Sequence, residues 1–331
     1  MNEPNYDLSS PRKAFSRIGL AFCTIVAVTT VLQVLWILIP WLIWGKDNWI
    51  ETSSWGMWLG TLIPSYCVAI PIGLYILRKL PAQKPQTHKL GFGKFLVLLP
   101  ICVCLMYGGN WIGTLLSSLL SGGTAENAVL DYAMDTNPLK VVAFVILIPL
   151  VEEYVCRKQL IDRTRQYGEK TAVFLSALIF GLLHQNLFQF FYAFALGLVF
   201  GYIYLRTGRL RYSVALHGFV NFLGSVVAPW VLSQANVDAM ANLDPNASPE
   251  QIMAVYQQIL PGVLLVVLYA FLLLGMFIAG LVLLIILHRR VIWKEADTPL
   301  PKRTVFKTVY LNAGMVLYVL LCIAFFILAL L

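Results

Sequence analysis

Charged residues are scarce in this chain. Of its 331 residues, 12% are Lys, Arg, Asp or Glu and 59% are apolar, whereas about a quarter of an ordinary soluble domain is charged. This composition excludes a soluble globular protein. Several apolar runs exceed the about 20 residues that are needed to cross a bilayer. The sequence therefore predicts an integral membrane protein whose main surrounding partner is the lipid bilayer.

Paired cysteines are also lacking. The six cysteines lie in or beside apolar runs, and no Cys-x-x-Cys spacing occurs among them. Because spacings of that kind mark zinc fingers and redox sites, neither of these is indicated. Cys102 and Cys104 are predicted to pack inside a membrane helix. Cys156 follows Glu152 by one turn on the same face, so a thiol nucleophile at this position is an alternative.

The apolar runs divide into about nine predicted transmembrane helices, with eight as the alternative count. The first run is too long for the apolar core of a signal peptide and lacks a small-residue cleavage site, so it is predicted to remain as an anchor. The fold class is therefore an all-α polytopic membrane bundle. The predicted spans are 18–44, 55–77, 95–120, 139–165, 170–186, 188–205, 211–232, 260–287 and 308–331.

The basic residues predict how this bundle is oriented. With nine alternating spans, all 24 Lys and Arg residues except Lys46 and Lys140 fall on one side of the membrane. Since Lys and Arg are enriched in cytoplasmic loops, this side is predicted to be cytoplasmic, with the N-terminus inside and the C-terminus outside. The same bias explains the net charge of +8, and no nucleic-acid partner is expected.

Three charged side chains interrupt the predicted span 139–165. Glu152, Glu153 and Arg157 follow an apolar run, and a charge at the centre of a bilayer costs about 2.5–3.5 kcal/mol. Glu153 and Arg157 are four residues apart, so they can pair along one face and support the helix. Glu152 lies about 100° round the helix from Glu153, and Pro149 predicts a kink just before it. Residues as costly as these indicate a functional site.

Two histidines and an asparagine interrupt the following spans. His184 lies as far after Gly168 as Glu152 lies before it, so an antiparallel hairpin that turns at Gly168 places both at one depth. His217 and Asn221 are four residues apart and share a helix face. Counted from the turn before that helix, Asn221 lies near the depth of Glu152, and His217 about one turn nearer the cytoplasm. The four side chains are therefore predicted to converge.

These residue types support hydrolysis by an activated water. In an apolar site Glu152 can act as a general base, while His184 positions the water or shuttles its proton. His217 and Asn221 can donate hydrogen bonds to the oxyanion of a tetrahedral intermediate. Alternatively, Glu152, His184 and His217 could form a zinc site with an open coordination position. The sequence leaves the metal question open.

The same positions carry a resemblance to a known family. Three short motifs occur in order on separate predicted spans, and they are Glu152-Glu153-x-x-x-Arg157, Phe180-x-x-x-His184 and His217-x-x-x-Asn221. Together they resemble the motifs of the CAAX-protease and bacteriocin-processing family of intramembrane proteases, also called the Abi family. The resemblance covers about residues 139–230.

This resemblance implies an all-α membrane endopeptidase with a cavity open toward the cytoplasm. It implies that Glu152 is the catalytic glutamate and that His184 binds the water. His217 and Asn221 would stabilise the oxyanion. The implied substrate is a membrane-associated protein or peptide, and zinc stays a candidate cofactor because the family is often called metalloproteases. Eukaryotic members trim prenylated CAAX proteins, whereas bacterial members are linked to bacteriocin maturation and immunity, so the expected location is a bacterial plasma membrane.

The resulting prediction divides the chain into three parts. Residues 1–138 hold a cytoplasmic lead and three scaffold spans, 139–232 the catalytic core, and 233–331 an outer loop and two further spans. In the outer loop, Ser248-Pro249-Glu250-Gln251 predicts a capping box at the start of a short outer helix. The chain has no His-Glu-x-x-His, Gly-x-Ser-x-Gly or Gly-Asp motif, which argues against other intramembrane protease classes. The rival interpretation is a non-enzymatic immunity scaffold or proton-coupled carrier, since intramembrane Glu and His also line proton pathways.

Overall fold

The protein is built from helices alone in the part of the chain that the computed structural model describes, which is all residues except 1–8, 128, 237–238, 240–243 and 245. By length and composition, six helices in this part are long and apolar enough to cross a membrane. The prediction of an all-α polytopic membrane bundle is therefore confirmed.

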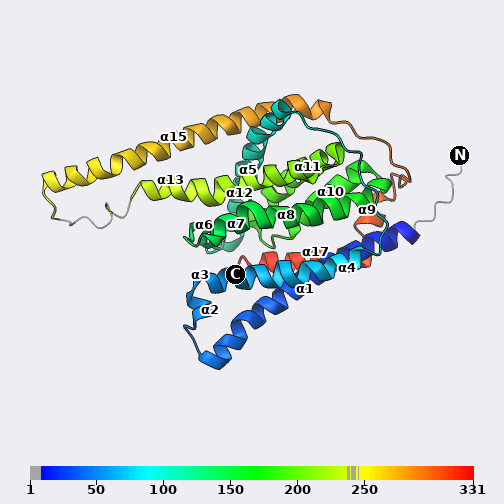
Figure 1. Ribbon diagram of the computed structural model, residues 1–331, viewed down its shortest axis with the longest axis horizontal. Helices are drawn as coiled ribbons and strands as arrows, with labels where there is room; N and C mark the ends of the chain where they lie inside the picture. Colours follow the sequence, from blue (N-terminus) through cyan, green and yellow to red (C-terminus); the bar gives the residue numbers. More distant parts are fainter. Residues whose placement is uncertain (1–8, 128, 237–238, 240–243, 245) are drawn as a thin grey trace.

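Nine helical rods in the described part fall within or overlap the nine predicted spans (Figure 1). They are α1 (Ser9–Trp44), α3 to α4 (Ser54–Leu77), α5 (Phe92–Ser121), α7 to α9 (139–164), α10 (Glu169–Leu182), α11 (Leu187–Thr207), α12 to α13 (Leu210–Gln234), α15 (Pro249–Leu287) and α17 (Ala313–Leu328). Short helices in the connections are α2 (Trp49–Thr52), α6 (Val129–Met134) and α16 (Val305–Val309). Of the nine rods, α10 and α17 are only 14 and 16 residues long.

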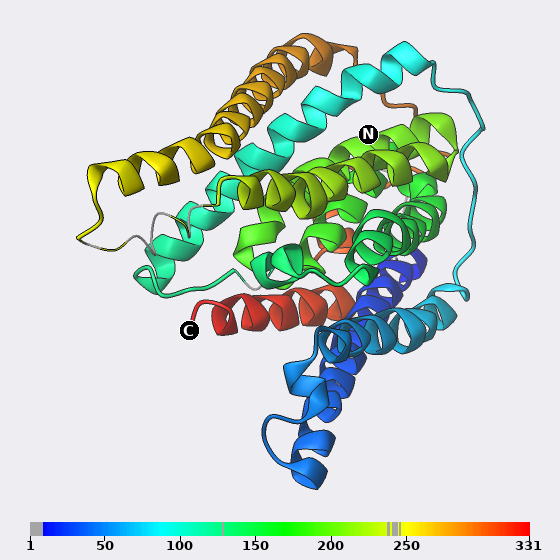
Figure 2. The same ribbon diagram turned by 60° about the vertical axis from the view of Figure 1, so that its left-hand side comes forward.

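The first and last helices pack together, although they lie at opposite ends of the chain (Figures 1 and 2). A Cβ atom at Gly314 would lie 1.8 Å from the carbonyl oxygen of Ser16, so only glycine permits this approach of α17 to α1. The hydroxyl of Tyr318 in α17 donates to the carbonyl oxygen of Ile179 in α10 at 3.2 Å. These contacts attach α1 and α17 to one side of the site-bearing helices.

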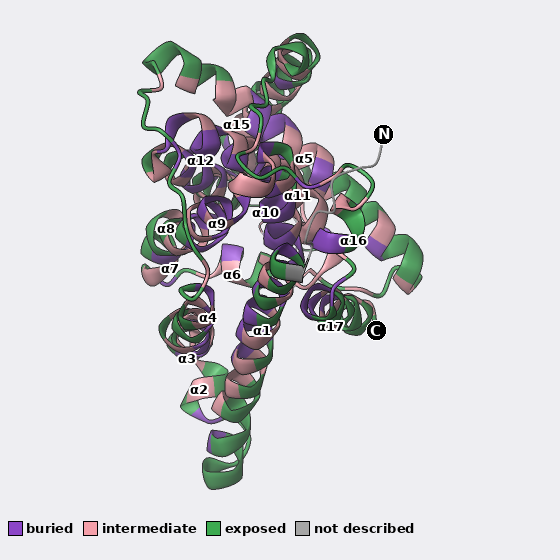
Figure 3. Cartoon of the chain, turned by 90° about the vertical axis from the view of Figure 1, so that its right-hand side faces the viewer, coloured by how far each residue is buried: buried purple, intermediate pink, exposed green. Residues whose placement is uncertain are grey.

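Burial separates the core of the bundle from a lipid-facing periphery. Buried residues concentrate in α9 to α12 and in the faces of α1 and α17 that meet them (Figure 3). The long helix α15 buries only Gly262 and Gly280, and its exposed residues are mostly apolar, as expected for a helix in contact with lipid. Polar residues inside the core are therefore the exceptions that need explanation.

The start of α15 differs in one respect from the sequence prediction. The expected capping box is present, because Ser248 Oγ accepts from the amide of Gln251 and Gln251 Oε1 accepts from the amide of Ser248. The sequence predicted a short separate helix after this cap, but α15 continues unbroken through Pro261 to Leu287. A proline removes one backbone bond, and the packing of Gly262 against the backbone of Gln234 holds the helix there.

The segments that carry the basic residues meet at one end of the bundle. Hydrogen bonds from backbone amides join the loop after α4 to α9 and to the end of α11, and they join the segment after α15 to the turn after α9 and to the start of α10. These bonds run from the amides of Gln83 to Asp162 O at 2.6 Å, His88 to Thr207 O at 2.8 Å, Lys294 to Glu169 Oε2 at 2.7 Å, and Thr298 to Gln166 O at 2.9 Å. The predicted clustering of these loops on one side is thus present in the fold.

Candidate active site

The helix that carries the two glutamates is irregular on both sides of them. Asn137 Oδ1 accepts from the amide of Leu139 at 2.9 Å and starts the helix. The chain then forms a π-helical segment at Ala143–Leu147, a short α-helix α8 (Ile148–Glu153) that contains Pro149, and a second π-helical segment at Tyr154–Gln159. Proline lacks an amide donor, and π-turns occur frequently at functional sites. The predicted kink is therefore realised as wide turns that flank Glu152.

Glu153 and Arg157 form an ion pair with no exposed side-chain surface. Arg157 Nε donates to Glu153 Oε2 at 3.0 Å, and Nη2 donates to Oε1 at 3.2 Å. Arg157 Nη1 also donates to Ser176 Oγ in α10 at 2.9 Å, and the guanidinium lies 4.5 Å above the ring of Phe180. The pair predicted along one helix face is thus present, and it also joins this helix to α10.

His217 in α12 lies between the two carboxylates. Its Nδ1 is 3.2 Å from Glu153 Oε1, and its Nε2 is 3.8 Å from Glu152 Oε2. A carboxylate only accepts hydrogen bonds, so the contact with Glu153 assigns a proton to Nδ1. The ring stacks on Phe200 and meets Phe180 edge-on, which fixes its orientation. In the neutral tautomer Nε2 is therefore an acceptor directed toward Glu152.

Glu152 has a partner that the sequence did not indicate. The hydroxyl of Tyr66 donates to Glu152 Oε1 at 2.8 Å. Tyr66 belongs to the π-helical segment Ile63–Ala69 between α3 and α4, a span predicted to be scaffold because it lacks residues charged at neutral pH. The signal that could have indicated it is the polar Ser65-Tyr66 pair directly after Pro64 inside an apolar run.

His184 lies just beyond the end of its helix. The sequence placed it inside a span that ends at residue 186, but α10 ends at Leu182 and His184 is in the turn that follows. Its Nδ1 is 2.8 Å from the carbonyl oxygen of Phe180, which only accepts, so Nδ1 carries the proton and Nε2 is an acceptor. The ring meets that of Tyr192 at 6.3 Å between centroids.

The amide of Asn221 contacts the glutamate-bearing helix about two turns before Glu152. Its Nδ2 donates to the carbonyl oxygen of Phe144 at 2.9 Å, and Phe144 precedes Glu152 by eight residues. His217, expected one turn nearer the basic end, is the residue that reaches Glu152. The predicted common level is therefore shifted along α12 by about one helical turn. One N–H of the Asn221 amide is used by Phe144, and the other remains to donate.

One cavity of about 550 Å³ brings these side chains together. Its lining is largely apolar, with a few polar groups that converge from several helices, as is typical of small-molecule and peptide sites. The predicted residues in this lining are Glu152, His184, His217 and Asn221, joined by Tyr66, Gln189 and Tyr192. Glu153 and Arg157 are buried behind it. Gln189 and Tyr192 come from the aromatic stretch 188–192 near the start of α11.

The predicted zinc ligands, Glu152, His184 and His217, all line this cavity. Among the described residues, no three or more His, Cys, Asp or Glu side chains are grouped so that they could hold a metal ion. Glu152 and His217 approach each other, and the bond from His184 Nδ1 to the carbonyl oxygen of Phe180 leaves Nε2 of His184 as an acceptor.

Comparisons with known proteins point to the same segment. Residues 135–223 match the family described as type II CAAX prenyl endopeptidase Rce1-like. The chain is also 26% identical, over an alignment of 176 residues, to the Bacillus subtilis (strain 168) protein named "Putative membrane peptidase YdiL". The alignment covers 50% of this chain and 69% of the relative. No solved structure matches the chain. The matches confirm the resemblance carried by the three motifs and support a membrane peptidase.

Proposed function

We propose that this membrane protein, whose residues 135–223 are Rce1-like, is an endopeptidase in which Glu152 activates a water for attack on a peptide bond. The substrate would be a membrane-associated protein or peptide. The observation that carries the proposal is the convergence of Glu152, Tyr66 and His217 at the wall of one cavity.

The spacing of two acceptors supports water activation. Glu152 Oε2 and His217 Nε2 are 3.8 Å apart, which is too long for a direct hydrogen bond and suits one water that bonds to both at about 2.8 Å. Glu152 would take the proton of this water as general base. Tyr66 holds the other carboxylate oxygen and thereby leaves Oε2 directed at the reacting water.

Two donors are available for the oxyanion. Once His217 is protonated, its Nε2–H can donate, while Nδ1 stays on Glu153. Asn221 can offer the amide hydrogen that Phe144 does not use. Donors held in place by packing stabilise a developing negative charge without reorganisation. When the carbon–nitrogen bond breaks, the proton that Glu152 took from the water passes to the leaving amine, and Nε2 of His184 can relay it within the cavity.

The test is cleavage of a panel of fluorogenic peptides, each with an apolar segment, by the purified protein in proteoliposomes. Glu152→Gln keeps the shape of the side chain and removes the base, so turnover should fall by about 10²- to 10⁴-fold. Glu126→Gln, an exposed glutamate in the loop before α6, is the matched control and should keep full turnover. Equal turnover of Glu152→Gln and wild type would refute the assigned role.

A further inference from the structure

The geometry points to a cavity that opens on the non-cytoplasmic face of the membrane. We infer that the peptide bond it receives belongs to an extracytoplasmic segment next to the bilayer or to a peptide bound in the outer leaflet. That the cavity receives a peptide bond rests on the proposed function. The side on which it opens rests on the positions of the basic residues and of the cavity in the fold. It replaces the cytoplasmic opening implied by the family resemblance.

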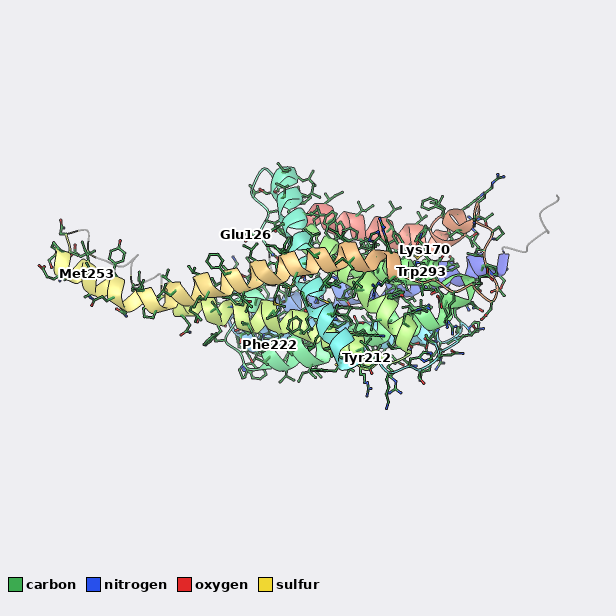
Figure 4. All side chains as sticks on the ribbon, turned by 90° about the horizontal axis from the view of Figure 1, so that it is seen from above. Glu126, Lys170, Tyr212, Phe222, Met253 and Trp293 are labelled. Atoms are coloured by element: carbon green, nitrogen blue, oxygen red, sulfur yellow. The ribbon has the colours of Figure 1, made fainter. Side chains whose placement is uncertain are left out.

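The cavity is lined by the helix ends that lie away from the basic loops. Gln33 from the second half of α1, Thr61 from the first half of the α3 to α4 rod and Asn110 from the second half of α5 all face it. In the alternating topology these three positions share the half of the bundle opposite the basic end. Figure 4 shows the same arrangement. Lys170, Tyr212 and Trp293 lie toward one end of the long axis, and Glu126 and Phe222 lie farther from that end.

A packed floor separates the cavity from the basic end. Directly below Glu152 lies the buried pair of Glu153 and Arg157, with the guanidinium against Phe180. Further residues without exposed surface fill the space on the same side, and they are Cys156, Leu160, Ile161, Leu175, Ser176 and Phe200. Protein interiors packed in this way leave no path for a peptide chain.

The opposite side of the cavity reaches the surface. Asn127 and Leu130, from the loop that contains α6, line the cavity, and Leu130 is 58% exposed. Side-chain bonds hold this loop across the mouth, since Tyr132 Oη lies 2.8 Å from Thr61 Oγ1 and Trp58 Nε1 donates to an oxygen of Asp135. The loop therefore borders the entrance, and its bonds to α3 limit how far that entrance opens.

The charge distribution assigns the two ends to the two sides of the membrane. All basic residues except Lys46 and Lys140 belong to segments at the floor end, and the hydrogen bonds among those segments bring them together. Excess Lys and Arg in short loops marks the cytoplasmic side. A floor that faces the cytoplasm leaves the mouth on the opposite face, so a cytoplasmic substrate terminus has no route to Glu152.

Single cysteines at two glycines test this inference. A Cβ at Gly224, in the cavity wall, and a Cβ at Gly91, in the basic loop before α5, would each meet nothing within 4 Å. Gly224→Cys and Gly91→Cys are made in a Cys67→Ser background, because Cys67 is an exposed native thiol. Each full-length variant is treated with a membrane-impermeant maleimide in sealed spheroplasts and in inverted membrane vesicles, with Glu126→Cys as a second reporter for the mouth end.

The expected result is labelling of Gly224→Cys and Glu126→Cys in spheroplasts, and of Gly91→Cys only in inverted vesicles. The reverse pattern would overturn the assigned orientation. Labelling of Glu126→Cys without Gly224→Cys in spheroplasts would also overturn the inference, since the cavity would then be closed on that face. The labelling needs no turnover, so an inactive protein would refute the proposed function and leave this result unaffected.

Discussion

Removing one member of the buried pair of Glu153 and Arg157 should lower the free energy of unfolding far more than removing one member of a more exposed pair. Arg157→Met leaves Glu153 as a buried carboxylate whose remaining side-chain partner is His217, and it also removes the bond to Ser176. Breaking a buried pair from one side costs about 3–5 kcal/mol, because the partner charge stays desolvated. The measurement is thermal unfolding of the purified protein in detergent, where a markedly lower midpoint is expected.

A double variant separates charge from packing. Glu153→Gln with Arg157→Met removes both charges and keeps an acceptor for His217 Nδ1, so it should recover most of the loss, since neutral replacements of buried pairs are often tolerated. Lys158→Met is the control, because its pair with Asp162 has the same spacing but 37% exposure at Lys158, and it should cost about 0–1 kcal/mol. If Arg157→Met were as mild as Lys158→Met, or if the double variant were the least stable of all, the reasoning would be wrong.

Further predictions concern the base, the helix contact and the metal. Tyr66→Phe should lower kcat about tenfold with KM retained, because a bond to a charged group is worth about 1.5 kcal/mol or more, whereas Tyr256→Phe on the exposed face of α15 should not. Gly314→Ala should lower the unfolding midpoint, since its Cβ would overlap Ser16 O, while Gly224→Ala has free space and should not. Turnover that depends on Glu152 alone should survive a zinc chelator, and a loss that added zinc restores would favour a zinc ion bound by Glu152, His184 and His217.

The sequence predicted the helices better than the depth in the bundle at which their site residues lie. Apolar runs set by the thickness of a bilayer indicated the rods, and the costly charges at Glu152 and Glu153 indicated the site. Counting residues from turns assumes a uniform rise of 1.5 Å. The π-helical segments around α8 and the early end of α10 break that assumption, and this is why His217 rather than Asn221 reaches Glu152.

Tyr66 could not be predicted for a different reason. A tyrosine in a membrane span is compatible with lipid contact, with a helix interface and with a hydrogen bond, and its own sequence neighbourhood does not choose among them. Its role follows from a contact between residues 86 positions apart. The same holds for Tyr192, whose ring faces His184 only because α11 turns back sharply after residues 183–186.

The two adjacent glutamates show how one helix can supply both a rigid support and a reactive group. Glu153 has no exposed surface, and both of its carboxylate oxygens accept hydrogen bonds from Arg157 or His217. It is therefore unsuited to take up a proton from a water. Glu152, about 100° round the helix, meets only a neutral hydroxyl at Oε1 and faces the cavity. His217 connects the two, because the carboxylate that fixes its Nδ1 also aims its Nε2 at the other. Exchanging the two roles would require the helix to turn by a residue, which the bond from Arg157 to α10 prevents.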